Sequence, residues 1–178
     1  MFYVAYGSNI SKKRMHERCP NAKFITRGCL DHTVLCFHYY ANIDSAHDYA
    51  VPVVLWDIPE SEVAALDRAE GFPKHYIKDK VLVIPQPRMT VEEMMTLVGA
   101  DNVHIQRDFM DDPNGIWGTT YIMTDWKKNR WEKHNKQTPI EYVKHLLDGY
   151  EEQGFDGLYL QDLWYALYRG EKPPESRT

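Results

Sequence analysis

Short apolar runs, separated by polar stretches and by glycine or proline, predict strands in the first two thirds of the chain and helices toward its end. The runs are rich in β-branched and aromatic residues, which favour strands. Strands are expected over residues 2–6, 32–40, 49–58, 76–84 and 118–124. Pro52 lies inside the third run and has no N–H to donate, so we expect it at a sheet edge or a bulge.

Helix-boundary signals predict two helices in the first half of the chain. A short helix over residues 11–18 should stop before Pro20. A second should open at Asp57, with Glu60 completing a capping box, and end at Gly71. Glu70 would then lie in its last turn.

The clearest helix of the chain lies near its end. Thr138 is expected as the N-cap, with Glu141 completing the capping box and Gly154 ending the helix. A last helix is expected over residues 158–169. The apolar stripe of the clearest helix would consist of Ile140, Val143, Leu147 and Tyr150.

This order of elements predicts an α+β fold rather than a regular β-α alternation. We expect a mixed, mostly antiparallel β-barrel or strongly twisted sheet, with helices packed outside. Residues 1–170 should form a single domain, and residues 171–178 a mobile polar tail. The stretch from about 85 to 115 looks like an insertion with its own helix, which Thr90 and Glu93 would cap and Gly99 would end.

Composition restricts the classes of function. The chain has 178 residues and a formal net charge of −5, so an overall basic surface for nucleic acid is not expected. It has no apolar run near the ~20 residues of a membrane span, and no signal-peptide pattern at its start. The odd set of three cysteines indicates reduced thiols. We therefore expect a cytoplasmic protein, a monomer or homodimer, with no membrane and no nucleic-acid partner.

The segment Gly7-Ser8-Asn9, directly after the first strand, has two interpretations. In the first, it simply turns a strand into a helix, with Ser or Asn as the N-cap. Alternatively, Gly7 adopts a conformation closed to other residues, and the N–H groups of Ser8, Asn9 and Ile10 converge on one hollow. Converging N–H donors suit a carboxylate or a developing oxyanion.

Glu70 also has two interpretations. A carboxylate in the last turn faces the negative end of the helix dipole, which raises its pKa. A lone glutamate at such a place is usually a solvated side chain at a frayed helix end. A raised pKa is, however, also what a general base needs at neutral pH.

Two motifs in register resemble those of the γ-glutamylcyclotransferase-like family. The stretch YVAYGSNI matches the family's opening motif Tyr-Gly-Ser-Asn-Leu, and ALDRAEGFPKHY contains its second motif, Leu-Asp-x-x-Glu-Gly followed by Tyr. The stretches TTYIM and TPIEYVKHLLDGYEEQGFD extend the likeness. It covers most of residues 2–165 outside the insertion. Ile10 in place of Leu should be harmless, whereas Ala69, where a larger residue is common, would widen the pocket beside Glu70.

The resemblance implies an enzyme that needs no metal or cofactor. It would cyclise the γ-glutamyl group of an amide or peptide to 5-oxoproline and release the free amine. Glu70 would be the catalytic acid/base. The substrate-binding residues carried over from the motifs are Tyr6, Gly7, Ser8, Asn9, Ile10, Tyr76 and Tyr121. The alternative is a catalytically inactive small-molecule binding or interaction domain on the same fold, in which Glu70 would have no role.

The sequence does not decide whether the leaving group is an alkylamine or a peptide. A peptide has a carboxylate, and Arg68, Lys74 or a nearby basic stretch would bind it. That basic, aromatic stretch, residues 125–136, is expected as a solvated loop at the mouth of the site. Its other interpretation is contact with single-stranded nucleic acid.

Possible metal ligands form one loose group in the sequence: His32, Cys36 and His38, with Cys29 nearby. The group lacks the paired spacing of zinc ligands, so we expect these residues to be ordinary strand residues and expect no metal site.

Overall fold

The computed structural model describes residues 1–105, 114–133, 138–157, 159–160 and 163. Its strands are β1 (Phe2–Ala5), β2 (Lys23–His38), β3 (Tyr40–Asp57), β4 (Tyr76–Pro85), β5 (Val103–His104) and β6 (Gly115–Met123). Its α-helices are α1 (Lys12–Arg18), α2 (Glu60–Glu70), α3 (Val91–Val98), α4 (Asp125–Lys133) and α5 (Ile140–Glu152). Two 3-10 helices, η1 (Ser8–Ile10) and η2 (Ala100–Asn102), complete the described elements.

The sheet closes on itself into a mixed barrel. Its strands follow the order β1-β3-β2-β4-β6-β5, and β1 also pairs with β6. That closing pair is parallel, with Tyr3 opposite Thr119, whereas the other pairs are antiparallel. Strand β5 is an extra strand on the edge of β6. The α+β fold with a mostly antiparallel barrel, predicted from the order of elements, is confirmed.

Strands β2 and β3 are much longer than the sequence pattern predicts. They pair from Lys23 opposite Asp57 to His38 opposite Tyr40, with register shifts at two places. Residues 41–48 are not predicted as strand because five of them are polar, which hides the strand pattern, although Ala41, Asn42 and Ile43 are buried. Strand β1 pairs only with residues 54–57 of β3. Pro52 therefore lies where β3 has β2 as its neighbour on one side and no strand on the other, and the expected edge position is confirmed.

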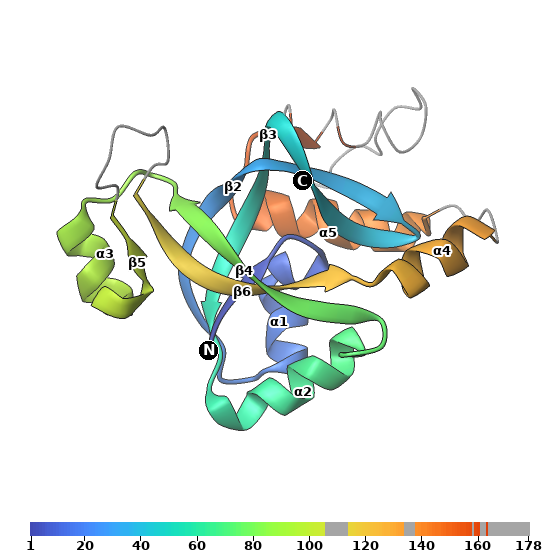
Figure 1. Ribbon diagram of the computed structural model, residues 1–178, viewed down its shortest axis with the longest axis horizontal. Helices are drawn as coiled ribbons and strands as arrows, with labels where there is room; N and C mark the ends of the chain where they lie inside the picture. Colours follow the sequence, from blue (N-terminus) through green and yellow to red (C-terminus); the bar gives the residue numbers. More distant parts are fainter. Residues whose placement is uncertain (106–113, 134–137, 158, 161–162, 164–178) are drawn as a thin grey trace.

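Alternate residues of the barrel strands enter two hydrophobic clusters, as the period of two in a strand requires. In one cluster, Trp56 packs with side chains of α1, α2 and α5, among them Met15, Leu66 and Leu146. In the other, Leu55 packs with Met94 and Val98 of α3. Helix α3 and strand β5 lie at one end of the barrel and α4 at the other (Figure 1).

Several expected helix boundaries differ in the structure. The N-cap of α2 is Pro59, without a side-chain cap, and the carboxylate of Asp57 lies 3.6 Å from the N-terminal amine instead. The N-cap of α5 is Pro139, again without a side-chain cap, so the role predicted for Thr138 is wrong. Of the apolar stripe expected on α5, Ile140 is 40% exposed, whereas Leu146, which the stripe did not include, is buried.

Other boundaries are as predicted. Thr90 and Glu93 form the expected capping box of α3, and Gly99 ends that helix. Gly71 ends α2 in the left-handed conformation, with φ of 68°. Most of the helix expected over residues 158–169, and the whole tail from 171, lie outside the described residues.

Residues 125–133 form helix α4, so the loop expected for the basic stretch is wrong over this part; residues 134–136 lie outside the described residues. The backbone carbonyl of Thr124 accepts from the N–H of Lys127 and Lys128 at 2.9 and 3.0 Å, which starts the helix. Within the described residues, no helix is both long and apolar enough to cross a membrane.

Candidate functional site

A cavity of about 270 Å³ is lined by residues of β1 and the loop after it, of β3, β4 and β6, and of α1, α2, α4 and α5. Its size is close to the lower end of typical ligand pockets, about 300–1,000 Å³. Elements from the whole length of the described chain contribute to it. Its lining consists of Tyr3, Tyr6, Gly7, Ser8, Asn9, Arg14, Arg18, Tyr40, Ala41, Ala69, Glu70, His75, Tyr76, Tyr121, Lys127 and Tyr142.

Glu70, the last residue of α2, lies against the loop that follows β1. Its Oε1 accepts a hydrogen bond from Asn9 Nδ2 at 2.8 Å and one from the guanidinium of Arg18 at 3.0 Å. Its other oxygen, Oε2, accepts none within the part of the chain that the structure describes. The Glu70 side chain is only 15% exposed. The structure therefore fixes this carboxyl group through one oxygen and leaves the second for another donor.

The environment of Glu70 raises the pKa of its carboxyl group. Burial is the largest cause, because it disfavours the charged form. The charge of Arg18 and the hydrogen bonds from Asn9 and Arg18 act in the opposite direction. The sequence analysis predicted a raised pKa from the helix dipole, whereas the main cause in the structure is burial.

The loop after β1 differs from the predicted conformation. Gly7 has φ of −103°, which any residue can adopt, so the expected special conformation is wrong. A Cβ on Gly7 would lie 3.3 Å from the hydroxyl oxygen of Tyr142, so a larger residue here would crowd that side chain. The N–H of Ile10 donates to the carbonyl of Gly7 at 3.0 Å and does not face the cavity.

Two backbone donors of this loop remain available. Ser8 and Asn9 begin the 3-10 helix η1, and the first N–H groups of a helix have no partner within it. Among the described residues, neither N–H makes a hydrogen bond. Ser8 and Asn9 line the cavity, whereas Ile10 is fully buried in the core and does not line it. The structure thus brings together all the expected substrate-binding residues except Ile10.

The two expected tyrosines line the cavity, but their hydroxyl groups have protein partners. Tyr121 donates to the carboxylate of Asp67, which also pairs with Lys78 at 2.7 Å. Tyr76 donates to the carbonyl of Ala41 at 3.4 Å. Burial raises the pKa of both groups, so they stay neutral at physiological pH. Ala69, expected to widen the wall beside Glu70, also lines the cavity.

Several residues of this cavity were not predicted from the sequence. Arg14 and Arg18 stand four residues apart on α1, a spacing that puts both on one helix face and could have indicated them. Within the described chain the Arg14 side chain has no hydrogen bond or ion pair, and its Nε is buried. Tyr142 of α5 and Lys127 of α4 come from far along the chain and had no local signal.

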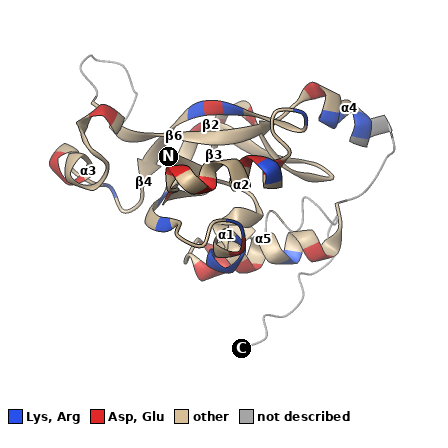
Figure 2. Ribbon diagram, turned by 90° about the horizontal axis from the view of Figure 1, so that it is seen from below, with Lys and Arg blue, Asp and Glu red and all other residues tan. Residues whose placement is uncertain are grey.

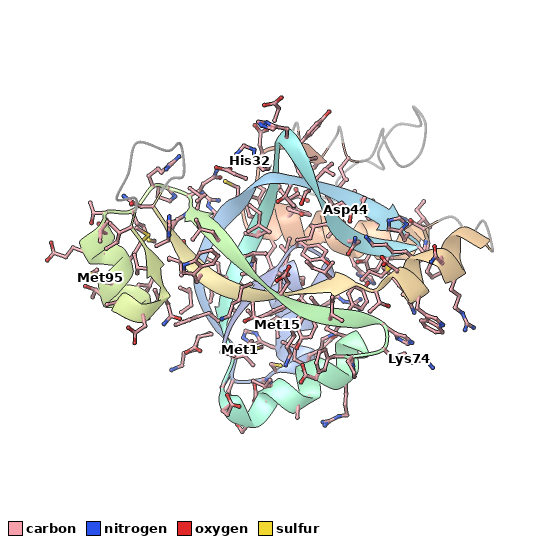
Figure 3. All side chains as sticks on the ribbon, viewed as in Figure 1. Met1, Met15, His32, Asp44, Lys74 and Met95 are labelled. Carbon is pink, nitrogen blue, oxygen red and sulfur yellow. The ribbon has the colours of Figure 1, made fainter. Side chains whose placement is uncertain are left out.

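The residues considered as metal ligands are only partly close together. Cys36, His38 and Asp44 place ligand atoms within 4.8 Å of one another, while His32 packs on His47. The thiol of Cys36 donates to Asp44 at 3.1 Å, and Lys128 pairs with the same carboxylate at 2.8 Å. Asp44, labelled in Figure 3, thus lies between β2 and α4. These groups satisfy one another and do not line the cavity.

The gamma-glutamyl cyclotransferase, AIG2-like family matches residues 3–117 of the chain. A solved structure named gamma-glutamyl cyclotransferase aligns with a TM-score of 0.65 and 20% identity, over 100% of this chain and 91% of its own. An uncharacterized protein from Homo sapiens aligns with a TM-score of 0.67 and 22% identity, over 99% and 90%. YkqA from Bacillus subtilis has a TM-score of 0.63 and 16% identity, over 94% and 54%. No match to a curated protein was found.

Proposed function

Because the chain belongs to the gamma-glutamyl cyclotransferase, AIG2-like family, we propose that it cyclises a γ-glutamyl amide or peptide to 5-oxoproline and releases the free amine. The observation that carries this proposal is the position of Glu70 in the same cavity as the free N–H groups of Ser8 and Asn9. One cavity thus offers a buried carboxyl group and two backbone N–H groups without a partner among the described residues, which are the kinds of group that such a reaction needs.

In this reaction, the α-amine of the substrate attacks its own γ-carbonyl carbon. A C–N bond forms to close a five-membered lactam, and the bond from the γ-carbonyl carbon to the leaving nitrogen breaks. The nucleophile is already tethered, so the enzyme gains by holding the cyclising conformer. Well-oriented intramolecular reactions save about 7–11 kcal/mol of barrier. The small cavity, lined by six buried or partly buried tyrosines and Ala41, supports such a restriction of the substrate.

Glu70 is the proposed general base and acid. The α-amine has a reference pKa of about 8 and is mostly protonated at neutral pH, so a group must remove its proton. Burial raises the pKa of Glu70 toward that of the amine, which makes this transfer easier. Oε2, to which no described residue donates, would take a proton from the α-amine and give it to the leaving nitrogen. The α-nitrogen loses a second proton as the lactam forms, and the released amine gains it and leaves as an ammonium.

The N–H groups of Ser8 and Asn9 are the proposed donors to the negative oxygen of the tetrahedral intermediate. They belong to the first turn of η1, whose position is fixed because Gln153 Nε2 donates to the carbonyl of Ile10 at 2.9 Å. Loss of one such donor in other enzymes costs about 3–4 kcal/mol. Arg14, which has no partner in the described chain, would pair with the α-carboxylate of the γ-glutamyl group.

The test is product analysis in water enriched in ¹⁸O. Purified protein is incubated with a panel of γ-glutamyl amides and peptides, and the products are identified by mass spectrometry. Cyclisation predicts 5-oxoproline without ¹⁸O and an equal amount of free amine, because no water enters the product. Glutamate carrying ¹⁸O would mean hydrolysis and would contradict the proposal. Tight binding of a γ-glutamyl compound without any product would favour the catalytically inactive binding domain.

A further inference from the structure

Three side chains that can bind a metal ion come together on one face of the β2–β3 hairpin. Cys36 and His38 are two residues apart on β2, so their side chains lie on the same face of the strand. Asp44 of β3 lies on that face as well, because it pairs with Val34, two residues before Cys36. The spacing within β2 did not indicate a metal site, since the third side chain comes from the neighbouring strand.

The possible ligand atoms are close enough to share one ion. Sγ of Cys36, Nε2 of His38 and a carboxylate oxygen of Asp44 all lie within 4.8 Å of one another. Sγ of Cys36 is 3.1 Å from Oδ2 of Asp44, and Nε2 of His38 is 4.0 Å from the same oxygen. Ligand atoms on a tetrahedral zinc ion are about 3.5 Å apart, given the usual zinc–ligand bond lengths. Small movements of these side chains would therefore place an ion between them.

The two oxygens of Asp44 have different partners. Oδ1 accepts hydrogen bonds from Nζ of Lys128 at 2.8 Å and from Nδ2 of Asn42 at 3.2 Å. Oδ2 is the oxygen nearest to Cys36 and His38. Outer hydrogen bonds of this kind orient the carboxylate ligands of metal ions. The partners of Oδ1 thus hold the carboxylate with Oδ2 toward the other two side chains.

Asn42 fixes this group to the barrel. It is fully buried, and its Oδ1 accepts from the N–H of Met123 on β6 at 2.8 Å. Lys128 links the group to α4 in the same way. The position of Asp44 is therefore set by contacts with β6 and α4, and not by the hairpin alone.

Charges of both signs surround the group. Lys128 pairs with Asp44, and Asp125 adds a negative charge near Lys128. Helix α4 begins with this acidic residue and carries basic residues after it (Figure 2). A thiolate, a carboxylate and a neutral imidazole together carry two negative charges. A divalent cation would neutralise this set of ligands.

The thiol of Cys36 is protonated at neutral pH, because burial raises its pKa to about 12. It donates to Oδ2 of Asp44, so its proton lies between two of the possible ligand atoms. A metal ion that binds here would take the place of this proton. The S–H bond breaks, a metal–sulfur bond forms, and the proton goes to the solvent.

We propose that Cys36, His38 and Asp44 bind a zinc ion, with water as the fourth ligand, and that the ion fixes the tip of the hairpin, residues 38–41. Sulfur and nitrogen ligands suit zinc, whereas magnesium and calcium take oxygen ligands. The ligands do not line the cavity, but Tyr40 and Ala41 of the tip do. The ion therefore has a structural role, and the inference does not depend on the proposed function.

The test is a titration of the purified protein with Co²⁺, which gives a charge-transfer absorption band when a thiolate binds it. The wild-type protein should show this band, saturate at one ion per chain, and lose the band when Zn²⁺ is added. Cys36→Ser should abolish the band and lower the affinity for Zn²⁺ by about 10-fold or more, measured by competition with a chromophoric chelator. The matched control is Cys29→Ser. Cys29 also lies on β2 and donates to Asp31 at 3.4 Å, but within the described chain it belongs to no such group.

A second measurement uses the wild-type protein alone, so it does not depend on the folding of a variant. With free Zn²⁺ at 100 times its Kd, Tm should rise by about 5 °C or more. Amide hydrogen exchange of residues 38–41 should slow by about 10-fold or more. Absence of the cobalt band from the wild-type protein, or its persistence in Cys36→Ser, would overturn the site. Unchanged exchange at the tip would overturn the structural role of the ion.

Discussion

Asn9 and Glu70 are 61 residues apart in sequence, yet Nδ2 of Asn9 donates to Oε1 of Glu70 at 2.8 Å. The same amide nitrogen lies 2.9 Å from the hydroxyl of Tyr3 on β1. This buried contact joins the two family motifs into one site, since each motif supplies one partner. It also orients the carboxyl group and joins it to the loop that follows β1.

Arg18→Met should move the acidic limb of the pH–activity profile to higher pH. The guanidinium of Arg18 favours the charged form of Glu70, so its loss raises the pKa of Glu70 further. A base with a higher pKa needs a higher pH to be ionised, and we expect a shift of about one pH unit or more. The measurement is kcat/KM as a function of pH. An acidic limb at the wild-type position would show that Arg18 does not act on the catalytic ionisation.

The raised pKa of Glu70 also predicts how folding stability depends on pH. Between the unfolded value, near 4.5, and the higher folded value, the folded state binds more protons than the unfolded state. The contribution of Glu70 to stability is therefore complete below pH 4.5 and falls as pH rises through the folded pKa. The free energy of unfolding of wild type minus that of Glu70→Gln should decrease over this range in urea titrations. An increase would contradict the pKa direction.

Tyr121→Phe should destabilise the protein by about 1–2 kcal/mol, because it removes a buried donor to a charged carboxylate. Asp67 keeps its ion pair with Lys78, which limits the loss. The control is Tyr49→Phe at a side chain that is 62% exposed and should change stability little. Both are measured by chemical denaturation. Equal values for the two variants would show that the Tyr121–Asp67 contact does not contribute.

Gly71→Ala should lower both stability and activity, whereas Gly99→Ala should lower stability alone. Both glycines have positive φ, so alanine strains the backbone by about 1–2 kcal/mol at either place. A Cβ on Gly71 would also lie 2.5 Å from Nδ1 of His75, while a Cβ on Gly99 meets no atom within 4 Å. Thermal melts and kcat/KM for one γ-glutamyl peptide separate the two effects. His75 lines the cavity, so its displacement should lower activity. Unchanged activity in Gly71→Ala would show that the position of His75 does not matter for catalysis.

Local patterns predicted the features that depend on neighbouring residues. The capping box of α3 and the glycine that ends α2 follow from residues within a few positions of each other, and both were found from the sequence. The strand pattern failed over residues 41–48, where five of the eight side chains are polar. Long antiparallel pairing with β2 makes this segment a strand despite its composition.

The site was predictable only as far as its motifs extend. Glu70 and the loop after β1 carried enough local signal, and the resemblance placed them together. Lys127 enters the cavity through tertiary packing, so nothing near it in sequence indicates its place there. Gly7 was assigned for its backbone freedom, although its Cβ position is limited by Tyr142, a residue 135 positions later in the chain. Contacts of this kind cannot be inferred from one segment.

The most direct test of the central claim is the amount of 5-oxoproline formed by Glu70→Gln, measured by mass spectrometry with a saturating γ-glutamyl peptide. The control is Glu60→Gln, at an exposed position in the first turn of the same helix. We predict that Glu70→Gln loses about 10²–10⁴-fold in kcat with its fold intact, while Glu60→Gln keeps the wild-type rate. Equal 5-oxoproline formation by wild type and Glu70→Gln would contradict the assignment of Glu70 as the catalytic acid/base.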